Sequence, residues 1–337
     1  MKKYSRLLSI ALMTALIMTS SLFAVFAAGE TPGTDPAPTP SEQVTPPAAP
    51  AAVLADTQGK NVVVSWTAVT EATEYRLTVV NGTKTLIDSS VGNITSYVVG
   101  GIDAAEDTTF TVKAISNGVE SAPAALVWNG VVPVKYQYTV KAACSLKSHA
   151  GKRKTLRLKK GDVVEATNFA AGQYIFKVNG STYYMNKTRA RNPKVVYTKK
   201  FNYDPEQIEL FVNRWGFKSK TKRMVFVSVY TQHLYVLAGK KGNWTAANGK
   251  GWEVSTGKAS TPTPTGRFTG SLKVHKKLKN RHGLPYWSCF SSFNAFHGKK
   301  SSWKLGSPKS GGCVRNEVKN AKWIFNNVPL KSRAVLY

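Results

Sequence analysis

The sequence predicts a mainly β protein of several domains, namely a β-sandwich, a small β-barrel and a larger, mostly β domain with a few helices. Short runs of alternating apolar and polar residues follow one another, and Asn-Gly or Gly turns separate them. A proline-rich stretch separates the N-terminus from the remainder. The excess positive charge begins only after residue 135, which indicates domains of different character within the 337 residues.

The N-terminus has the pattern of a secretory signal, expected to occupy residues 1–28. Three basic residues precede an apolar run, residues 7–26, which ends in small residues. An uncleaved membrane anchor is the alternative reading of this segment. Residues 29–50 contain seven prolines and predict an extended linker. We therefore expect the protein to be exported and to act outside the cytoplasm.

Residues 51–131 predict an all-β domain of the sandwich type. Four runs are expected to be strands: residues 62–66, 75–79, 97–99 and 109–114. Asn81-Gly82 is a hairpin turn signal after the second run. The patterns Val-x-Trp at 64–66, Ala-x-x-Tyr-Arg-Leu at 72–77 and Phe-x-Val-x-Ala at 110–114 resemble a fibronectin type III module. This module is expected to be a spacer or an adhesive element.

Residues 136–195 predict a second, smaller β domain. A Lys-Lys-Gly-Asp turn at 159–162 precedes a strand, and residues 174–181 form a hairpin with Asn179-Gly180 at its tip. These features resemble a bacterial SH3-like domain of the kind found in wall enzymes, which implies binding to wall material. One run departs from that family, because Cys-Ser-Leu-Lys at 144–147 replaces a Leu-Asn-Val-Arg-like sequence.

Residues 201–221 predict a helical connector. Asp204 can cap the helix, Pro205 suits its first turn, and Gln207 completes a capping box. Gly216 is expected to end the helix. Its apolar face should contain Ile208, Phe211, Val212 and Trp215. We expect this helix to pack against the domain that follows.

A candidate nucleophile and a candidate base occur in the last part of the chain. Cys313 follows two glycines, Gly311 and Gly312, and precedes Arg315, while His297 lies upstream. Cysteine attacks as the thiolate, which a neighbouring imidazole and positive charge favour. The backbone N–H groups of Gly312 and Cys313 can approach a developing oxyanion without hindrance from a side chain. The residues predict nucleophilic acyl transfer, with Cys313 as nucleophile and His297 as general base.

Five motifs occur in a fixed order between residues 222 and 337. They are Ser-Thr-Gly-Lys at 255–258, Thr-Pro-Thr-Pro-x-Gly-x-Phe at 261–268, Pro-Tyr-Trp at 285–287, His-Gly at 297–298 and Ser-Gly-Gly-Cys-Val-Arg at 310–315. In this order they resemble the YkuD family of L,D-transpeptidases. The resemblance implies a cysteine that attacks the third-residue carbonyl of a peptidoglycan stem tetrapeptide and releases D-alanine. An amine of a neighbouring stem then takes the acyl group to form a cross-link.

The resemblance also assigns roles. Cys313 matches the nucleophile, His297 the general base and acid, and Arg315 the arginine that follows the cysteine. The family usually has Ser-His-Gly-Cys, so Gly311 stands where a second histidine is expected. If that imidazole contributes to thiolate formation or substrate binding, turnover is reduced here. The residues expected to contact the substrate are Ser310, Gly311, Tyr286 and Trp287.

A helix is expected directly after the cysteine motif. Asn316 is predicted as its cap, and Pro329 marks its end. Its apolar face should contain Val318, Ala321, Phe325 and Val328. The dipole at the N-terminus of such a helix would favour a thiolate at Cys313.

The remaining cysteines and histidines are weaker candidates. Three cysteines leave at least one free thiol, and the sequence does not decide whether Cys144 pairs with Cys289, although both are favoured as small hydrophobic residues. Cys289 has no glycine pair beside it, and His282 lies farther from the nucleophile than His297. His275 belongs to a basic run. No metal-ligand spacing occurs, so no cofactor is expected.

Charge is distributed unevenly along the chain. Residues 51–135 contain 5 Lys and Arg against 8 Asp and Glu, whereas residues 136–337 contain 39 against 7. Such an excess attracts polyanions. No nucleic-acid-binding motif is present, and an exported protein seldom meets nucleic acid. The expected partners are therefore anionic wall polymers together with peptidoglycan stem peptides, and the expected location is the cell wall.

Two other functions are alternatives. A Cys/His wall peptidase of the NlpC/P60 kind also occurs with SH3-like domains, but its nucleophile precedes its histidine. A non-catalytic wall-binding adhesin is the second alternative. The sequence does not identify the acceptor amine (diaminopimelate, lysine or a free D-amino acid), the ligands of the β modules or the oligomeric state.

Overall fold

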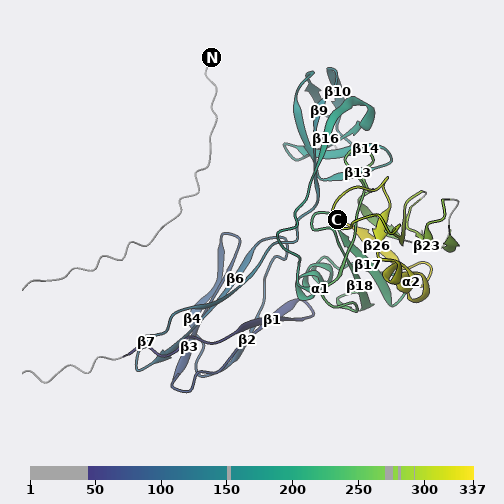
Figure 1. Ribbon diagram of the computed structural model, residues 1–337. Helices are drawn as coiled ribbons and strands as arrows, with labels where there is room; N and C mark the ends of the chain where they lie inside the picture. Colours follow the sequence, from purple (N-terminus) through teal and green to yellow (C-terminus); the bar gives the residue numbers. More distant parts are fainter. Residues whose placement is uncertain (1–44, 150–152, 270–275, 280–281, 292) are drawn as a thin grey trace, which may run out of the picture. The chain divides into compact units, whose positions relative to one another are not determined.

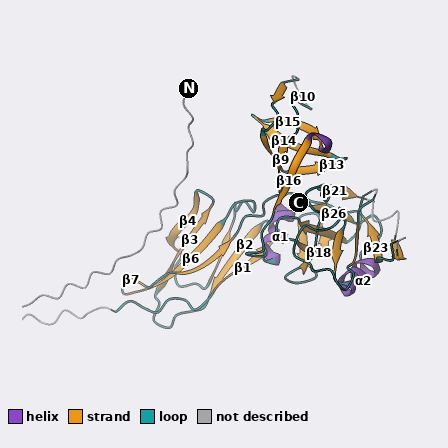
Figure 2. Ribbon diagram, turned by 45° about the horizontal axis from the view of Figure 1, so that its top comes forward, coloured by secondary structure: helices purple, strands orange, loops and turns teal. Residues whose placement is uncertain are grey.

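The computed structural model describes residues 45–149, 153–269, 276–279, 282–291 and 293–337 (Figure 1). The expected signal, the linker up to residue 44 and His275 lie outside these residues. The described residues belong to one compact unit, Val44–Tyr337. Strands dominate its regular structure (Figure 2), which confirms the predicted mainly β, multidomain class. None of the helices in the described ranges is long and apolar enough to cross a membrane.

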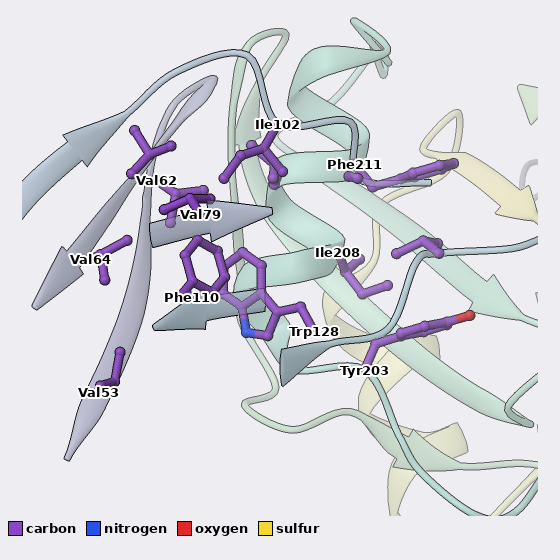
Figure 3. Packing of buried hydrophobic residues seen from close by; sticks show 14 of the residues in the cluster. Val53, Val62, Val64, Val79, Ile102, Phe110, Trp128, Tyr203, Ile208 and Phe211 are labelled. Atoms are coloured by element: carbon purple, nitrogen blue, oxygen red, sulfur yellow. The ribbon is translucent and has the colours of Figure 1, made fainter. Parts of the chain in front are cut away.

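The N-terminal module contains two sheets that enclose one core. Their strand orders are β1-β2-β5 and β4-β3-β6-β7, and β8 also pairs with β6. The bounds are β1 Val53–Gln58, β2 Asn61–Trp66, β3 Glu74–Asn81, β4 Lys84–Ser90, β5 Ser96–Val99, β6 Thr108–Ser116, β7 Val119–Glu120 and β8 Ala124–Trp128. Alternate residues of β3 are buried, and the rings of Phe110 and Trp128 meet edge to face with centroids 5.2 Å apart (Figure 3). All four predicted strands are confirmed.

The middle module is also built from short antiparallel strands, in sheets ordered β12-β9-β16, β13-β14-β15 and β10-β11. The bounds are β9 Lys135–Val140, β10 Cys144–Lys147, β11 Thr155–Leu158, β12 Val163–Ala166, β13 Asn168–Ala170, β14 Gln173–Val178, β15 Ser181–Asn186, η1 Lys187–Arg189 and β16 Ala190–Val196. Asn179 and Gly180 have φ of 46° and 75° at the tip of the predicted hairpin. The stacked rings of Tyr138 and Tyr174, 4.5 Å apart, belong to its core.

Helix α1 (Pro205–Arg214) forms where the sequence predicts a helix, within residues 201–221. Its capping interaction is present, since Gln207 Oε1 accepts a hydrogen bond from the Asp204 N–H at 2.9 Å. Gly216 has a φ of 63° just beyond the helix. Trp215 shares the predicted face, since its ring stacks on that of Phe211 with centroids 5.5 Å apart. It is nevertheless 50% exposed, whereas Ile208, Phe211 and Val212 are buried.

The C-terminal domain contains two sheets. One has the order β19-β18-β17-β26-β21 with β20 paired to β18, and the other has the order β22-β23-β24-β25. The bounds are β17 Arg223–Ser228, β18 His233–Lys240, β19 Asn243–Ala246, β20 Trp252–Glu253, β21 Gly266–Thr269, β22 Lys276–Lys279, β23 Pro285–Cys289, β24 Ala295–Gly298, β25 Val314–Asn316 and β26 Arg333–Leu336. Apolar residues of both sheets share one core, including Val225, Phe296 and Val314.

Helix α2 (Val318–Asn327) follows the cysteine motif as expected, but it begins later than predicted. Asn316 is not its cap, because Asn316 belongs to β25, where it pairs with Gly298 of β24. Its Nδ2 donates to Val314 O at 3.0 Å. Glu317 occupies the cap position. Val318 is 42% exposed rather than buried, while Ala321 and Val328 are buried as expected. The strand β25 therefore lies between Cys313 and the N-terminus of the helix.

Candidate active site

The parallel pairing of β24 with β25 brings the candidate base to the candidate nucleophile. His297 pairs with Arg315, and Phe296 pairs with Val314. Paired residues lie on the same side of a sheet, and successive residues alternate between its two sides. Phe296 and Val314 are fully buried in the core, so His297 and Arg315 occupy the opposite face. Cys313 directly precedes β25, and its thiol accepts a hydrogen bond from the backbone of Ala295, the first residue of β24.

His297 is buried and held in one orientation. Its Nδ1 lies 2.9 Å from Gly298 O, which favours the tautomer with a proton on Nδ1 and a free acceptor at Nε2. Trp287 stacks on the ring with centroids 5.3 Å apart, and Trp303 meets it edge-on at 6.4 Å. Burial lowers the His297 pKa to about 4. The imidazole is therefore neutral near pH 7 and able to accept a proton.

Cys313 is a free, half-buried thiol. Its Sγ lies 3.9 Å from Phe293 O, and hydrogen bonds from the Ala295 backbone and the Asn294 side chain favour the thiolate. Burial outweighs these contacts and the nearby Arg315, and it raises the Cys313 pKa to about 11. No direct hydrogen bond joins Cys313 to His297, both of which belong to the described residues. In the resting site Cys313 is therefore a neutral thiol and His297 a neutral imidazole. The nearby positive charge does not by itself produce the thiolate.

Ser310 organises the turn that carries the thiol. Its Oγ donates to Cys313 O at 2.5 Å and accepts from the Gly312 N–H at 3.0 Å. The Gly312 N–H, expected to bind an oxyanion, is thus engaged with Ser310 in the resting state. The Cys313 N–H has no hydrogen-bond acceptor within the described part of the chain, so it is free to receive an oxyanion. Gly311 faces open space, since a Cβ at this position would meet no atom within 4 Å.

The two aromatic residues expected to contact the substrate lie in different surroundings. Trp287 covers His297, as described above. Tyr286, whose φ is 54°, places its ring 5.8 Å from that of Phe325 in α2. Sequence reasoning missed Trp303, whose ring lies 3.7 Å from the guanidinium carbon of Arg315. Its one sequence signal is a single aromatic residue in the basic run between the histidine and cysteine motifs.

A loop of threonines and prolines, residues 259–265 (the Thr-Pro loop), packs against Ser310. Thr261 Oγ1 donates to Ser310 O at 3.2 Å, and Lys258 N also reaches Ser310 O, at 3.0 Å. Thr263 Oγ1 accepts from Gly257 N at 2.7 Å. A Cβ on Gly257 would lie 2.3 Å from Thr261 O, so the close approach requires glycine. The Thr-Pro loop thus supports the turn that carries Cys313.

The middle module holds the other side of the Thr-Pro loop. Tyr174 OH donates to Ala259 O at 3.1 Å, and Tyr136 OH donates to Thr263 O at 3.3 Å. Phe169 and Thr265 exchange two hydrogen bonds, of 3.0 and 2.9 Å. The sequence does not predict these contacts, because they join residues 85 to 127 positions apart. They join it, through the loop, to Ser310.

The remaining sequence candidates do not enter the site chemistry. All three cysteines are free, so Cys144 and Cys289 do not pair. Cys289 is buried and donates to Ser291 O at 2.5 Å. His282 precedes β23, outside the strand pair that carries His297. Within the described ranges, no three His, Cys, Asp or Glu side chains are grouped as metal ligands.

Comparison with known families identifies the last domain. Residues 222–336 match the family model of the L,D-transpeptidase catalytic domain, YkuD. No curated protein matches the sequence significantly. The matched segment includes β17 to β26 and therefore Cys313, His297 and Arg315.

Several solved structures are similar to parts of the chain. A fused Zn-dependent amidase/peptidase/peptidoglycan-binding domain-containing protein from Clostridium acetobutylicum is 25% identical over 42% of this chain and 66% of that one, with a TM-score of 0.34. An L,D-transpeptidase from Mycobacterium tuberculosis is 13% identical over 87% and 100%, with a TM-score of 0.28. A two-domain fibronectin type III segment of chicken tenascin is 14% identical over 44% and 97%, with a TM-score of 0.22. The chain spans 66% of the Clostridium protein, and 58% and 63% of two further solved L,D-transpeptidases.

The two glycines before Cys313 should respond differently to alanine. Gly312 has a φ of 117°, and a Cβ there would lie 2.5 Å from Asn294 Nδ2. Gly312→Ala should lower the free energy of unfolding by about 1–3 kcal/mol. It should also slow alkylation of Cys313 by iodoacetamide, because Asn294 would be displaced from the thiol. Gly311→Ala is the matched control and should leave both quantities unchanged; equal effects of the two variants would contradict this geometry.

Removing the Tyr174 hydroxyl should loosen the Thr-Pro loop. Tyr174→Phe should cost about 0.5–1.5 kcal/mol of stability and accelerate hydrogen exchange of the Lys258 amide, which donates to Ser310 O. Tyr138→Phe is the control, because the buried Tyr138 hydroxyl has no hydrogen-bond partner among the described residues. That variant should be neutral or stabilising. If both variants exchange the Lys258 amide at the wild-type rate, the middle module does not support the loop.

Proposed function

We propose, from the premise that residues 222–336 are an L,D-transpeptidase catalytic domain of the YkuD family, that the protein is a peptidoglycan L,D-transpeptidase. Its substrates are stem tetrapeptides, and Cys313 and His297 carry the chemistry. The observation that supports this most is the parallel β24–β25 pairing, in which His297 pairs with Arg315, two residues after Cys313.

Acylation begins with a neutral thiol and a neutral imidazole. His297 Nε2 accepts the Cys313 proton as Sγ attacks the carbonyl carbon of the third stem residue. The carbonyl oxygen becomes an oxyanion, which the Cys313 N–H stabilises. The Gly312 N–H joins it when its bond to Ser310 opens. His297 then gives the proton to the departing amine, the C–N bond breaks, D-alanine leaves and a thioester remains on Cys313.

Cross-linking reverses these proton transfers. An amine of a neighbouring stem attacks the thioester carbonyl, and His297 takes a proton from that amine. The C–S bond breaks, the new amide forms, and the proton returns to Cys313. Since burial raises the thiol pKa and lowers the imidazole pKa, the proton transfer accompanies attack on the bound substrate instead of preceding it. Arg315 orients groups beside His297 without itself exchanging a proton.

The other parts of the chain fit an exported wall enzyme. We assign residues 51–131 as a fibronectin type III-like domain, residues 136–195 as an SH3-like domain and residues 201–221 as their helical connector to the catalytic domain. Residues 136–337 contain 39 basic residues but only 7 acidic ones, and this positive charge favours attachment to anionic wall polymers. Residues 1–28 are proposed to direct export, which gives an extracytoplasmic, wall-associated location.

A product assay with disaccharide tetrapeptides tests this function. The wild type should form cross-linked dimers and a covalent carbapenem adduct, and Cys313→Ala should form neither. His297→Gln should slow both reactions by about 10²–10⁴-fold, because the general base is lost. Cys144→Ala, a free thiol in the middle module, is the control and should retain full activity. Shortened stems without dimers would indicate a peptidase, and no product or adduct from the wild type would favour an adhesin.

A further inference from the structure

A basic cavity adjoins the candidate active site. Its volume is about 280 Å³, and its lining residues are Ser302, Trp303, Lys304, Lys309 and Arg315. Within the described part of the chain, none of its three cationic side chains forms an ion pair. An acidic ligand would therefore meet cations that no protein carboxylate neutralises.

The cavity is connected to the proton-transfer group by direct contacts. Arg315 pairs with His297 across β24 and β25, and its guanidinium carbon lies 3.7 Å from the centre of the Trp303 ring. The same ring lies 6.4 Å from that of His297. Arg315 and Trp303 thus belong both to the cavity wall and to the surroundings of the base.

The acidic side chains near this segment have other neighbours. Glu317 pairs with Lys299 at 3.6 Å. Glu253 lies against the backbone of Gly306, where a Cβ would be 2.1 Å from its Oε1 and 2.8 Å from Lys199 Nζ. Neither carboxylate belongs to the cavity lining. The positive charge of Lys304, Lys309 and Arg315 is therefore left for a ligand.

We propose that this cavity binds the terminal carboxylate of the donor peptide, which is the carboxylate of the departing D-alanine. This deepens the proposed function and rests on it. His297 protonates the departing amine, and the carboxylate is bonded to the same carbon as that amine. The carboxylate must therefore lie close to His297, and Arg315, which pairs with His297, also lines the cavity. A guanidinium and two ammonium groups are the donors that recognise a carboxylate.

The site would also select the length of the donor. One additional residue moves the terminal carboxylate by about 3.5 Å. The carboxylate of a pentapeptide would then no longer meet Arg315 while the third-residue carbonyl remains at Cys313. The cavity thus favours a tetrapeptide that ends in a free acid over an amidated one, and the same contact would account for the tetrapeptide donor that the proposed function assumes.

Binding to the unreactive Cys313→Ala variant tests the subsite. Calorimetry would compare the tetrapeptide acid, the same peptide with a C-terminal carboxamide, and the pentapeptide. We expect the acid to bind at least about tenfold more tightly than the amide, as for a charge-assisted hydrogen bond. Adding Lys309→Met should reduce this difference, because one of the three cationic groups is lost, while Lys319→Met, an exposed lysine on α2, should preserve it. Thermal melting confirms that each variant is folded.

Three outcomes would overturn the subsite: equal binding of acid and amide, no binding of the acid, or full displacement of the peptide by inorganic phosphate at equal concentration, which indicates an unselective anion site. The product assay separates these from failure of the enzyme. If the wild type turns over the substrate but acid and amide bind equally, the protein is a transpeptidase and the proposed subsite is refuted. If Cys313→Ala binds the acid more tightly than the amide but the wild type gives no product or adduct, the subsite is supported and the transpeptidase activity is refuted.

Discussion

The site depends on the parallel hydrogen bonding of two short strands, β24 and β25. Because Phe296 and Val314 are buried in the core, the register of the pair determines which residues face outward. A shift of one residue would turn His297 into the core. The packing that stabilises the domain therefore also sets the orientation of His297, the proposed base.

The turn that carries Cys313 has little regular structure of its own and takes its shape from neighbours. The Ser310 side chain forms hydrogen bonds with Gly312 and Cys313, the Thr-Pro loop binds the Ser310 carbonyl, and tyrosines of the middle module bind the loop. The middle module thus has a structural role at the turn that carries Cys313. The activity of the catalytic domain should depend on an intact middle module even where no wall polymer is present.

Features set by local interactions could be predicted from the sequence. The Asn179-Gly180 hairpin and the cap of α1 depend on neighbouring residues, and motif order located Cys313 and His297. Contacts between distant residues could not be predicted, as for Tyr174 with Ala259, which are 85 positions apart. Asn316 has a typical cap side chain, yet strand pairing with Gly298 overrides that preference. The protonation states of His297 and Cys313 could not be predicted either, because they depend on burial, which follows from tertiary packing.

The proposed chemistry requires a neutral, oriented imidazole and a protonated thiol at the start of the reaction. An NMR titration of ¹⁵N-labelled His297 can establish the charge of the imidazole. We predict a single titration with a pKa of about 4 and, at pH 6, a neutral ring with its proton on Nδ1. A ring that remains charged above pH 6 and loses that charge in Cys313→Ala would reveal an imidazolium–thiolate pair and exclude this starting state.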